Sequence, residues 1–240
     1  DHGLVRDQLT FYAPMFEARY KSITQVIRTS GAAQILELAS GYSLRGLDLT
    51  RGEAIRYVET DLSDVVATKR SLLADIRRQH GIPFTSLHTV AVADALDFEQ
   101  VRKTAGVFDR ERPLMVLCEG LIGYLTRDET ARLAANIHRL LASHGDGWWV
   151  VPDFSFRSDL RDLPPERIRL REAVTGITER QLDASAFEDS NELAAFLHSS
   201  GFDVQVRSQI DETPSFSSLA ALGLPPALLE RLRPVLRLWV

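Results

Sequence analysis

The feature that most constrains the fold is a regular alternation of short apolar runs with stretches of helical periodicity. The apolar runs cover residues 34–39, 55–60, 88–93, 113–118, 147–152 and 202–207, and the closing VLRLWV predicts one more strand. Alternating strands and helices are typical of a mostly parallel sheet with helices packed on both of its faces. We therefore predict an α/β fold with a mostly parallel seven-stranded sheet.

One of the predicted helices has clear ends. It covers about residues 64–80 and ends at Gly81, because a glycine readily adopts the left-handed conformation that closes a helix. Its apolar spacing predicts the buried positions, which are Val65, Leu72, Leu73 and Ile76.

The chain is long enough for one large domain, and 45% of its 240 residues are apolar. We predict a single domain over 1–240, with an N-terminal helical cap over 1–30. Residues 155–185 break the rhythm of strands and helices with charges and the pair Pro164 and Pro165. We predict a lid insertion there, and a plain pair of surface helices is an equal alternative. The sequence begins at Asp1 rather than methionine, which leaves open that a segment precedes it.

The charge balance excludes some classes of partner. Lys and Arg number 28 against 33 Asp and Glu, a net charge of −5, so we expect no nucleic-acid partner. The sequence has no long uncharged apolar stretch, so we expect no membrane contact.

The single cysteine, Cys118, fits a reducing compartment, and we predict a cytoplasmic protein. The histidines lack metal-ligand spacing, so we predict no metal.

The segment Ile35–Gly46, ILELASGYSLRG, joins a buried strand to the start of a helix through a turn. Glu37 lies inside the apolar run, and Gly41 lies in the turn. The dinucleotide fingerprint needs glycines in the order G-x-G-x-x-G, and this spacing is absent. A turn that brings the backbone close to a smaller ligand without phosphate fits better, and S-adenosylmethionine (SAM) is such a ligand.

Polar side chains follow the ends of the next predicted strands. Glu59 and Asp61 end the second strand, Asp94 follows the third, and Glu119 and Tyr124 follow the fourth. An acid at this edge can accept hydrogen bonds from ribose hydroxyls, and a second carboxylate can bind the amine of adenine. A single acid of this kind is usually a solvated loop residue. Polar residues at four consecutive strand ends favour a binding site at the carboxyl edge of the sheet.

Four segments of the chain carry a family resemblance. They are ILELASGYSLRGLDLT, YVETDLSDVVATKRSLL, VAVADALD and LCEGLIGYLTRDE. They resemble the leucine carboxyl methyltransferase family, most closely its bacterial branch of O-methyltransferases of polyketide synthesis, the tetracenomycin type. The resemblance runs from about Arg19 to the C-terminus, and EGLIGYLTRDE is its most specific part. It implies a Rossmann-like class I methyltransferase fold with SAM as the cofactor.

The resemblance also implies roles for individual residues. Arg19 matches an arginine that holds the carboxylate of the cofactor, and Asp61 matches the acid that binds ribose. Asp94 matches the adenine contact, Glu119 an acid near the amino group, and Tyr124 an aromatic residue that lines the site. The residues that we assign to the cofactor are Arg19, Glu37, Gly41, Glu59, Asp61, Asp94, Ala95 and Glu119.

Two positions depart from the family pattern, which is usually G-x-G-x-D after the first strand. Ala39 replaces the first glycine, and Ser43 replaces the aspartate. These changes motivate an alternative from another class, a non-catalytic SAM-binding or interaction protein. An NAD-dependent enzyme is a third possibility, which the glycine spacing disfavours.

The residue types favour a carboxylate as the methyl acceptor. A carboxylate with a pKa near 4 is already ionised at neutral pH and needs no general base, only a group that positions it. Tyr124 is the best candidate for that role, while Arg45 and Arg157 are more easily read as surface groups. We therefore predict an O-methyltransferase that acts on a small molecule, with a carboxylate of a polyketide-like or other secondary metabolite as the expected acceptor and a hydroxyl acceptor left open. The sequence does not predict an oligomeric state.

Overall fold

The computed structural model describes residues 3–52, 54–161 and 165–240, which fall into two compact units. The first unit comprises the chain up to Gly31, Ile122–Arg127 and Val151–Val240, and the second comprises Ala32–Leu121 and Asp128–Val150. A single domain over 1–240 stays a prediction, as does a cap over 1–30, whose first two residues lie outside the described part.

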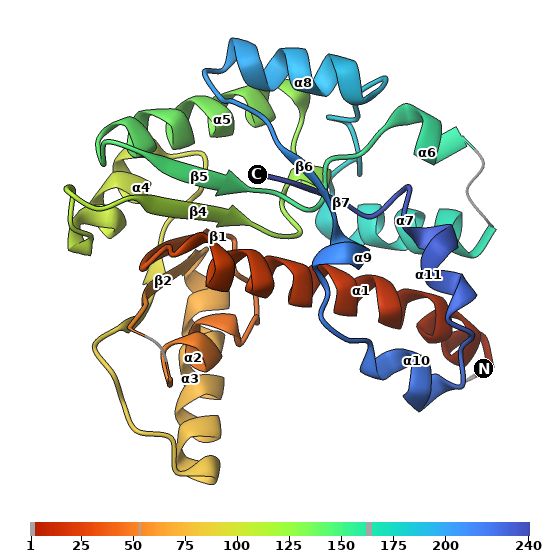
Figure 1. The fold of residues 1–240 in the computed structure, drawn as a ribbon, viewed down its shortest axis with the longest axis horizontal. Helices are drawn as coiled ribbons and strands as arrows, with labels where there is room; N and C mark the ends of the chain where they lie inside the picture. The colour runs from red at the N-terminus through yellow and green to blue at the C-terminus, as the bar shows by residue number, and fades with distance from the viewer. Residues whose placement is uncertain (1–2, 53, 162–164) are drawn as a thin grey trace. The chain divides into compact units, whose positions relative to one another are not determined.

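A five-stranded parallel sheet forms the centre of the second unit (Figure 1). Its strands are β1 (Gln34–Leu38), β2 (Arg56–Asp61), β3 (His88–Val92), β4 (Leu114–Cys118) and β5 (Gly147–Val150). They lie in the order β3-β2-β1-β4-β5, and every neighbouring pair is parallel. Every residue of β1 and β4 is buried, as expected for central strands covered on both faces. Five of the predicted strands are therefore confirmed.

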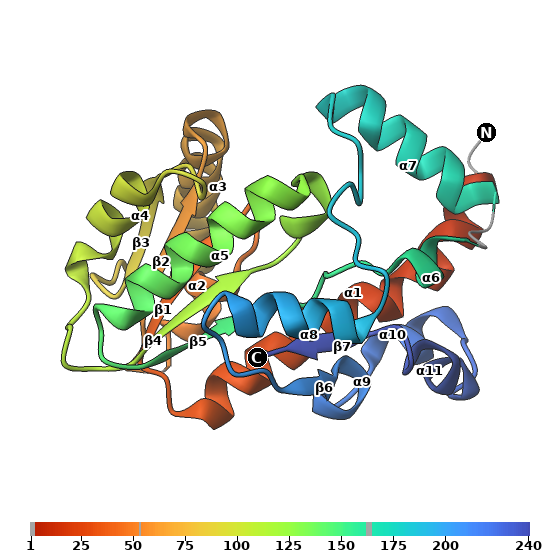
Figure 2. The ribbon, with the colours of Figure 1, turned by 90° about the horizontal axis from the view of Figure 1, so that it is seen from above.

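Helices connect these strands on both faces of the sheet. They are α2 (Arg45–Leu49), α3 (Ser63–His80), α4 (Phe98–Thr104) with the 3-10 turn η1 (Ala105–Val107), and α5 (Arg127–Ala142). Figures 1 and 2 show α2 and α3 on one side of the strands and α4 and α5 on the other. The strand order explains this, because right-handed crossovers that run in opposite directions along a sheet place their helices on opposite faces.

The buried face of α3 differs from the prediction. The helix ends at Gly81 as expected, with a φ of 61°. Its buried residues are Val66, Lys69 and Leu73, whereas Leu72 is 45% exposed. Apolar periodicity misplaced this face because it counts a lysine as a surface residue, and Lys69 points into the core.

The first unit combines the N-terminal helix with the C-terminal part of the chain. Its helices are α1 (Gly3–Ser30), the 3-10 turn η2 (Ile122–Tyr124), α6 (Arg157–Arg161), α7 (Pro165–Thr178), α8 (Ser190–Ser199), α9 (Gln209–Glu212), α10 (Ser217–Leu222) and α11 (Ala227–Leu232). Helix α1 runs beside α9 and α10 (Figures 1 and 2). Ala18 of α1 packs in a buried apolar cluster with Ile210, Leu232 and Leu236.

The structure does not show the predicted seven strands as one continuous sheet. The last two strands, β6 (Val206–Ser208) and β7 (Arg237–Trp239), pair antiparallel with each other in a separate two-stranded sheet. An isolated antiparallel bridge joins Trp239 to Val151, the residue that follows β5. The run 202–207 carries the exposed polar residues Asp203 and Gln205 in alternation with apolar ones. This alternation is typical of a half-exposed antiparallel strand rather than a buried parallel one.

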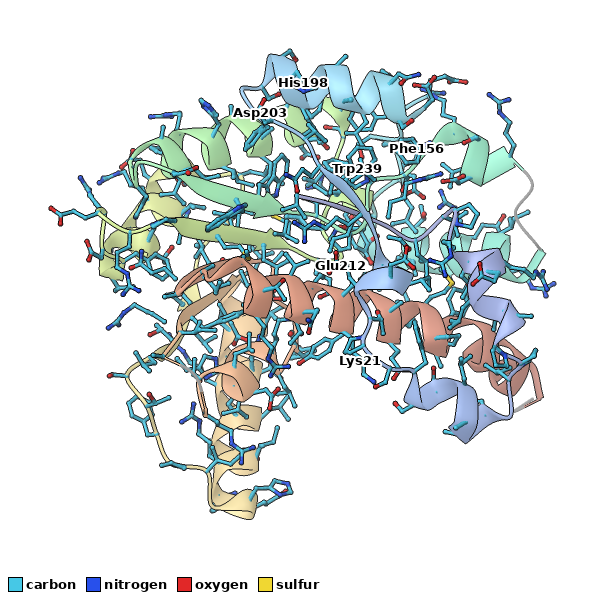
Figure 3. The ribbon with its side chains drawn as sticks, in the orientation of Figure 1. Lys21, Phe156, His198, Asp203, Glu212 and Trp239 are labelled. Atoms are coloured by element: carbon cyan, nitrogen blue, oxygen red, sulfur yellow. The ribbon has the colours of Figure 1, made fainter. Side chains whose placement is uncertain are left out.

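The predicted insertion over 155–185 contains α6 and α7, and its residues 162–164, including Pro164, lie outside the described part. Its two ends meet, because Phe156 pairs with Phe187 in an isolated parallel bridge. The ring of Phe156 lies 6.1 Å from that of Trp239, and both are labelled in Figure 3. A lid function for this segment stays a prediction.

Candidate functional site

The turn after β1 has an unusual backbone. Ala39 and Gly41 have φ angles of 52° and 49°, in the left-handed region that favours glycine and is costly for alanine. The amide of Ser40 between them donates to the carbonyl of Thr60 at 2.9 Å, which ties the turn to the end of β2. Ala39 therefore holds a backbone conformation that glycine adopts more readily.

Asp61 fastens this turn to the end of β2. One carboxylate oxygen accepts a hydrogen bond from the amide of Gly41 at 2.7 Å, and the other accepts from the amide of Leu62 at 2.8 Å. Asp61 is partly exposed, and the apolar side chain of Leu62 beside it is 60% exposed. The structure thus brings together the predicted turn glycine and the predicted ribose acid.

Asp94 lies at the same edge, just beyond β3. Its carboxylate is exposed and accepts from the amide of Leu96 at 2.9 Å, while Ala95 is buried. The amide of Ala93 donates to the carbonyl of Asp61 at 3.0 Å, which keeps the ends of β2 and β3 in register. Asp61 and Asp94 therefore extend from adjacent strand ends.

Glu37 is buried inside the sheet. Its carboxylate accepts hydrogen bonds from Arg45 and from the hydroxyl of Tyr57, both at 2.9 Å. Burial raises the pKa of Glu37 to about 7; Arg45 opposes this rise, and the nearby carboxylates of Glu59 and Glu119 add to it. Burial and Glu37 also raise the pKa of Tyr57, which keeps its hydroxyl protonated as a donor.

Arg45 is completely buried and joins two strands. One terminal nitrogen binds Glu37, and the other donates to Glu119 at 2.6 Å. Glu119 follows β4 directly, and its side chain keeps 16% exposure. Burial lowers the pKa of Arg45, but the carboxylates around it raise that pKa by a larger amount. The guanidinium therefore stays charged. The interpretation of Arg45 as a surface group is wrong, whereas Arg157 is exposed as expected.

Glu59 is also completely buried, beneath the turn. Its carboxylate lies 3.0 Å from the ammonium nitrogen of Lys69, which donates in turn to the hydroxyl of Ser40 at 3.0 Å. The amide of Gly46 donates to the other oxygen of Glu59 at 3.3 Å. A Cβ atom at Gly46 would lie 2.7 Å from Glu59, so only glycine fits there. Lys69 thus links α3, β2 and the turn.

His88 completes the surroundings of Glu59. Its Nε2 lies 3.0 Å from the Glu59 carboxylate, and its Nδ1 lies 3.1 Å from a terminal nitrogen of Arg77. A guanidinium only donates, so Nδ1 is the acceptor, and the proton on Nε2 points to Glu59. His88 therefore belongs to the buried network under the site.

Arg19 and Tyr124 belong to the first unit. Arg19 lies on α1 with its guanidinium carbon 5.0 Å from the ring centre of Phe16. Tyr124 ends η2 and is 36% exposed, and the carbonyl of Gly123 accepts from the amide of Asp183 at 2.8 Å. The other predicted site residues lie in the second unit and are Glu37, Gly41, Glu59, Asp61, Asp94, Ala95 and Glu119.

Sequence reasoning missed the cations that hold these acids. Arg45 and Lys69 carry the charges that Glu37 and Glu59 need, because a buried carboxylate is costly without a partner. The signal was present, since acids inside apolar strands demand buried cations nearby.

Among the described residues, no three His, Cys, Asp or Glu side chains are grouped so that they could hold a metal ion. No helix in the described part is long and apolar enough to span a membrane.

The strand order reverses between β1 and β4, which is where open α/β sheets generally bind their ligands. Residues 5–138, more than half of the chain, match the sequence profile of leucine carboxyl methyltransferase. The chain belongs to the leucine carboxyl methyltransferase family.

Individual relatives agree with this membership. A protein of Mycolicibacterium gilvum named as a SAM-dependent methyltransferase is 38% identical over 114 residues, which are 48% of this chain and 36% of that protein. A Mycobacterium tuberculosis protein of the same name is 28% identical over 203 residues, 82% of this chain and 55% of that protein. The chain thus spans only about a third to a half of these relatives.

The fold also resembles solved structures. A Nostoc punctiforme protein described as an O-methyltransferase superposes with a TM-score of 0.53 at 17% identity. The match covers 85% of this chain and 56% of that protein. At this identity the likeness concerns the fold alone, an α/β methyltransferase fold with a mostly parallel five-stranded sheet.

Proposed function

We propose that this chain binds SAM at the carboxyl edge of the five-stranded sheet and transfers its methyl group to an oxygen of a small molecule. The observation that carries the proposal is the contact of Asp61 with the amide of Gly41, which joins the predicted ribose acid to the turn after β1. The names of the relatives from Mycolicibacterium gilvum and Mycobacterium tuberculosis support SAM as the cofactor.

The charges at this edge fit SAM better than a dinucleotide. The carboxylates of Asp61, Asp94 and Glu119 are exposed or partly exposed, whereas the cations of Arg45 and Lys69 are buried beneath them. An edge of this kind repels a pyrophosphate and attracts the sulfonium and ammonium groups of SAM. This charge pattern argues against the NAD-dependent alternative.

The residues at this edge suggest a division of roles. Asp61 would bind the ribose hydroxyls, with Gly41 giving the backbone close approach. Asp94, with Ala95 behind it, would bind adenine, and Glu119 would bind the amino group. Glu37 and Glu59, which the sequence assigned to the cofactor, are completely buried, and we propose instead that they support the site from within through Arg45 and Lys69. We propose from the family resemblance alone that Arg19 binds the carboxylate of the cofactor.

The proposed acceptor is a small carboxylate of the polyketide type, as in the bacterial branch that the sequence resembles. When bound, SAM would supply a methyl group on its sulfonium: the carboxylate oxygen would bond to the methyl carbon as the S–CH3 bond breaks and S-adenosylhomocysteine leaves, so an ionised acceptor would need no general base. The enzyme's task is then to orient the acceptor and exclude water. We propose Tyr124 as the residue that orients it, and a cytoplasmic location for the protein.

A non-catalytic SAM-binding protein is the second candidate. The observation that favours it is Ser43, which stands where the family usually has an aspartate. Incubation with methyl-labelled SAM and a panel of carboxylic acids and phenols separates the two, because only an enzyme forms labelled ester or ether.

Substitution of Asp61 tests the cofactor site. Asp61→Asn keeps the size of the side chain but loses the charge that strengthens hydrogen bonds to hydroxyls. We expect the dissociation constant of S-adenosylhomocysteine (SAH), measured by titration calorimetry, to rise roughly 10- to 100-fold, since a hydrogen bond to a charged group contributes about 1.5–3 kcal/mol.

The matched control is Asp64→Asn, an exposed aspartate three residues further along, in the first turn of α3. We expect this change to leave SAH affinity within about twofold, because exposed charges away from a ligand contribute little. NADH titrated into the wild-type protein should give no binding signal. Equal SAH affinity in all three proteins would remove Asp61 from the site, and NADH binding without SAH binding would reject the proposed function.

A further inference from the structure

Two acids from neighbouring strands lie where the strand order of the sheet reverses. Strand β1 pairs with β2 on one side and with β4 on the other, and the chain enters β4 only after β3. Open α/β sheets bind their ligands just outside this switch point. Glu37 is the fourth residue of β1, and Glu119 follows the last residue of β4. Both acids therefore lie at the strand pair that faces the expected ligand.

One side chain connects these acids. Arg45 opens α2, and its side chain returns to the strand ends, where Nη1 donates to Glu37 at 2.9 Å and Nη2 to Glu119 at 2.6 Å. Arg45 and Glu37 are completely buried, and Glu119 keeps partial exposure. The guanidinium of Arg45 thus links the partly exposed carboxylate of Glu119 to the buried carboxylate of Glu37.

We infer that Arg45 is a positioning residue, which holds Glu119 in the orientation that binds the ammonium group of the cofactor. The inference rests on the proposed function. Arg45 is fully buried and acts through Glu119. A guanidinium is a planar fork that can bind two carboxylates at once, whereas a lysine ammonium is a point charge on a flexible stem. Without the bridge, Glu119 loses a contact that orients its carboxylate, and cofactor binding must then supply that order.

The test compares two ligands on the full chain. One is SAH, and the other is its deaminated analogue, in which hydrogen replaces the α-amino group. Wild-type protein should prefer SAH by roughly 10- to 100-fold in dissociation constant, the effect of one charged hydrogen-bonded pair. In Arg45→Lys this preference should fall below about threefold, while affinity for the analogue stays within about threefold, because lysine cannot hold both acids.

Two further variants separate positioning from general damage. Glu119→Gln removes the proposed ligand of the ammonium group and should lose the preference as Arg45→Lys does. Tyr57→Phe removes the other side-chain hydrogen bond to Glu37 but leaves the bridge from Arg45 to Glu119 in place. It should keep the wild-type preference even where its stability falls. If Arg45→Lys does not unfold cooperatively and is therefore not properly folded, the neutral variant Arg45→Gln replaces it in the same comparison of the two ligands.

The outcomes are distinguishable. An Arg45 variant that keeps the wild-type preference overturns this inference and leaves the proposed function intact. Loss of the preference in Tyr57→Phe also overturns it, since any disturbance of the buried network would then suffice. A wild-type protein that binds neither ligand rejects the proposed function itself.

Discussion

Lys69→Met is expected to lower the free energy of unfolding by about 3–5 kcal/mol, because removing one partner of a buried ion pair leaves an uncompensated charge. Methionine fills nearly the same volume, so packing changes little. The ammonium of Lys69 lies 3.0 Å from Glu59, and both side chains are fully buried. Urea unfolding followed by circular dichroism measures the effect, with the midpoint and slope fitted separately.

Two variants check the cause of that loss. Lys103→Met makes the same change at an exposed position in the last turn of α4, where we expect less than about 0.5 kcal/mol. The double variant Lys69→Met with Glu59→Gln should recover part of the lost stability, because the buried charge is removed with its partner. A Lys69→Met variant as stable as the wild type would contradict a stabilising ion pair between Lys69 and Glu59.

Glu37→Gln is expected to change how stability depends on pH. The ordinary pKa of this carboxyl is 4.5, and in the folded protein it is about 7, so the folded state binds a proton more tightly than the unfolded chain. That contribution to stability is complete below pH 4.5 and is lost as the pH rises through 7. The free energy of unfolding of the wild type should therefore fall by roughly 3 kcal/mol relative to that of Glu37→Gln between pH 5 and pH 8, at about 1.4 kcal/mol per pKa unit.

The measurement is urea unfolding of both proteins at several pH values, since their difference cancels the groups that they share. Glu99→Gln is the control. Glu99 is exposed, and Arg102 holds its pKa below the ordinary value, so its effect has the opposite sign and lies at lower pH. Parallel stability curves for the wild type and Glu37→Gln would contradict the assignment and mean that Glu37 is ionised throughout this range.

The sheet of the second unit was predictable because buried parallel strands are continuous apolar runs. The acids at its carboxyl edge were predictable for the same reason, since a polar residue marks the point where each run stops. Asp61 and Asp94 illustrate this, and the structure places both at adjacent strand ends. Pattern reasoning succeeds where burial alone decides the residue type.

The buried ion pairs were not predictable in this way. Arg45 was interpreted as a surface residue, and Lys69 was not among the predicted buried residues of its helix, because a single sequence shows their charge but not the distant carboxylate that neutralises it. The strands β6 and β7 were assigned to the main sheet because three-residue strands carry no signal of their partner. The left-handed turn at Ala39 was also hidden, since alanine rarely adopts it.

We propose that SAM binds at the turn after β1 and at the ends of β2 and β3. Hydrogen exchange read by mass spectrometry, with and without saturating SAH, tests it most directly, because a bound ligand slows the opening of the backbone that it contacts. We predict slower exchange in peptides that cover residues 39–46, 59–64 and 92–97, and unchanged exchange over 101–112. Bound SAH that protects other segments and leaves these three unchanged would contradict cofactor binding at this edge of the sheet.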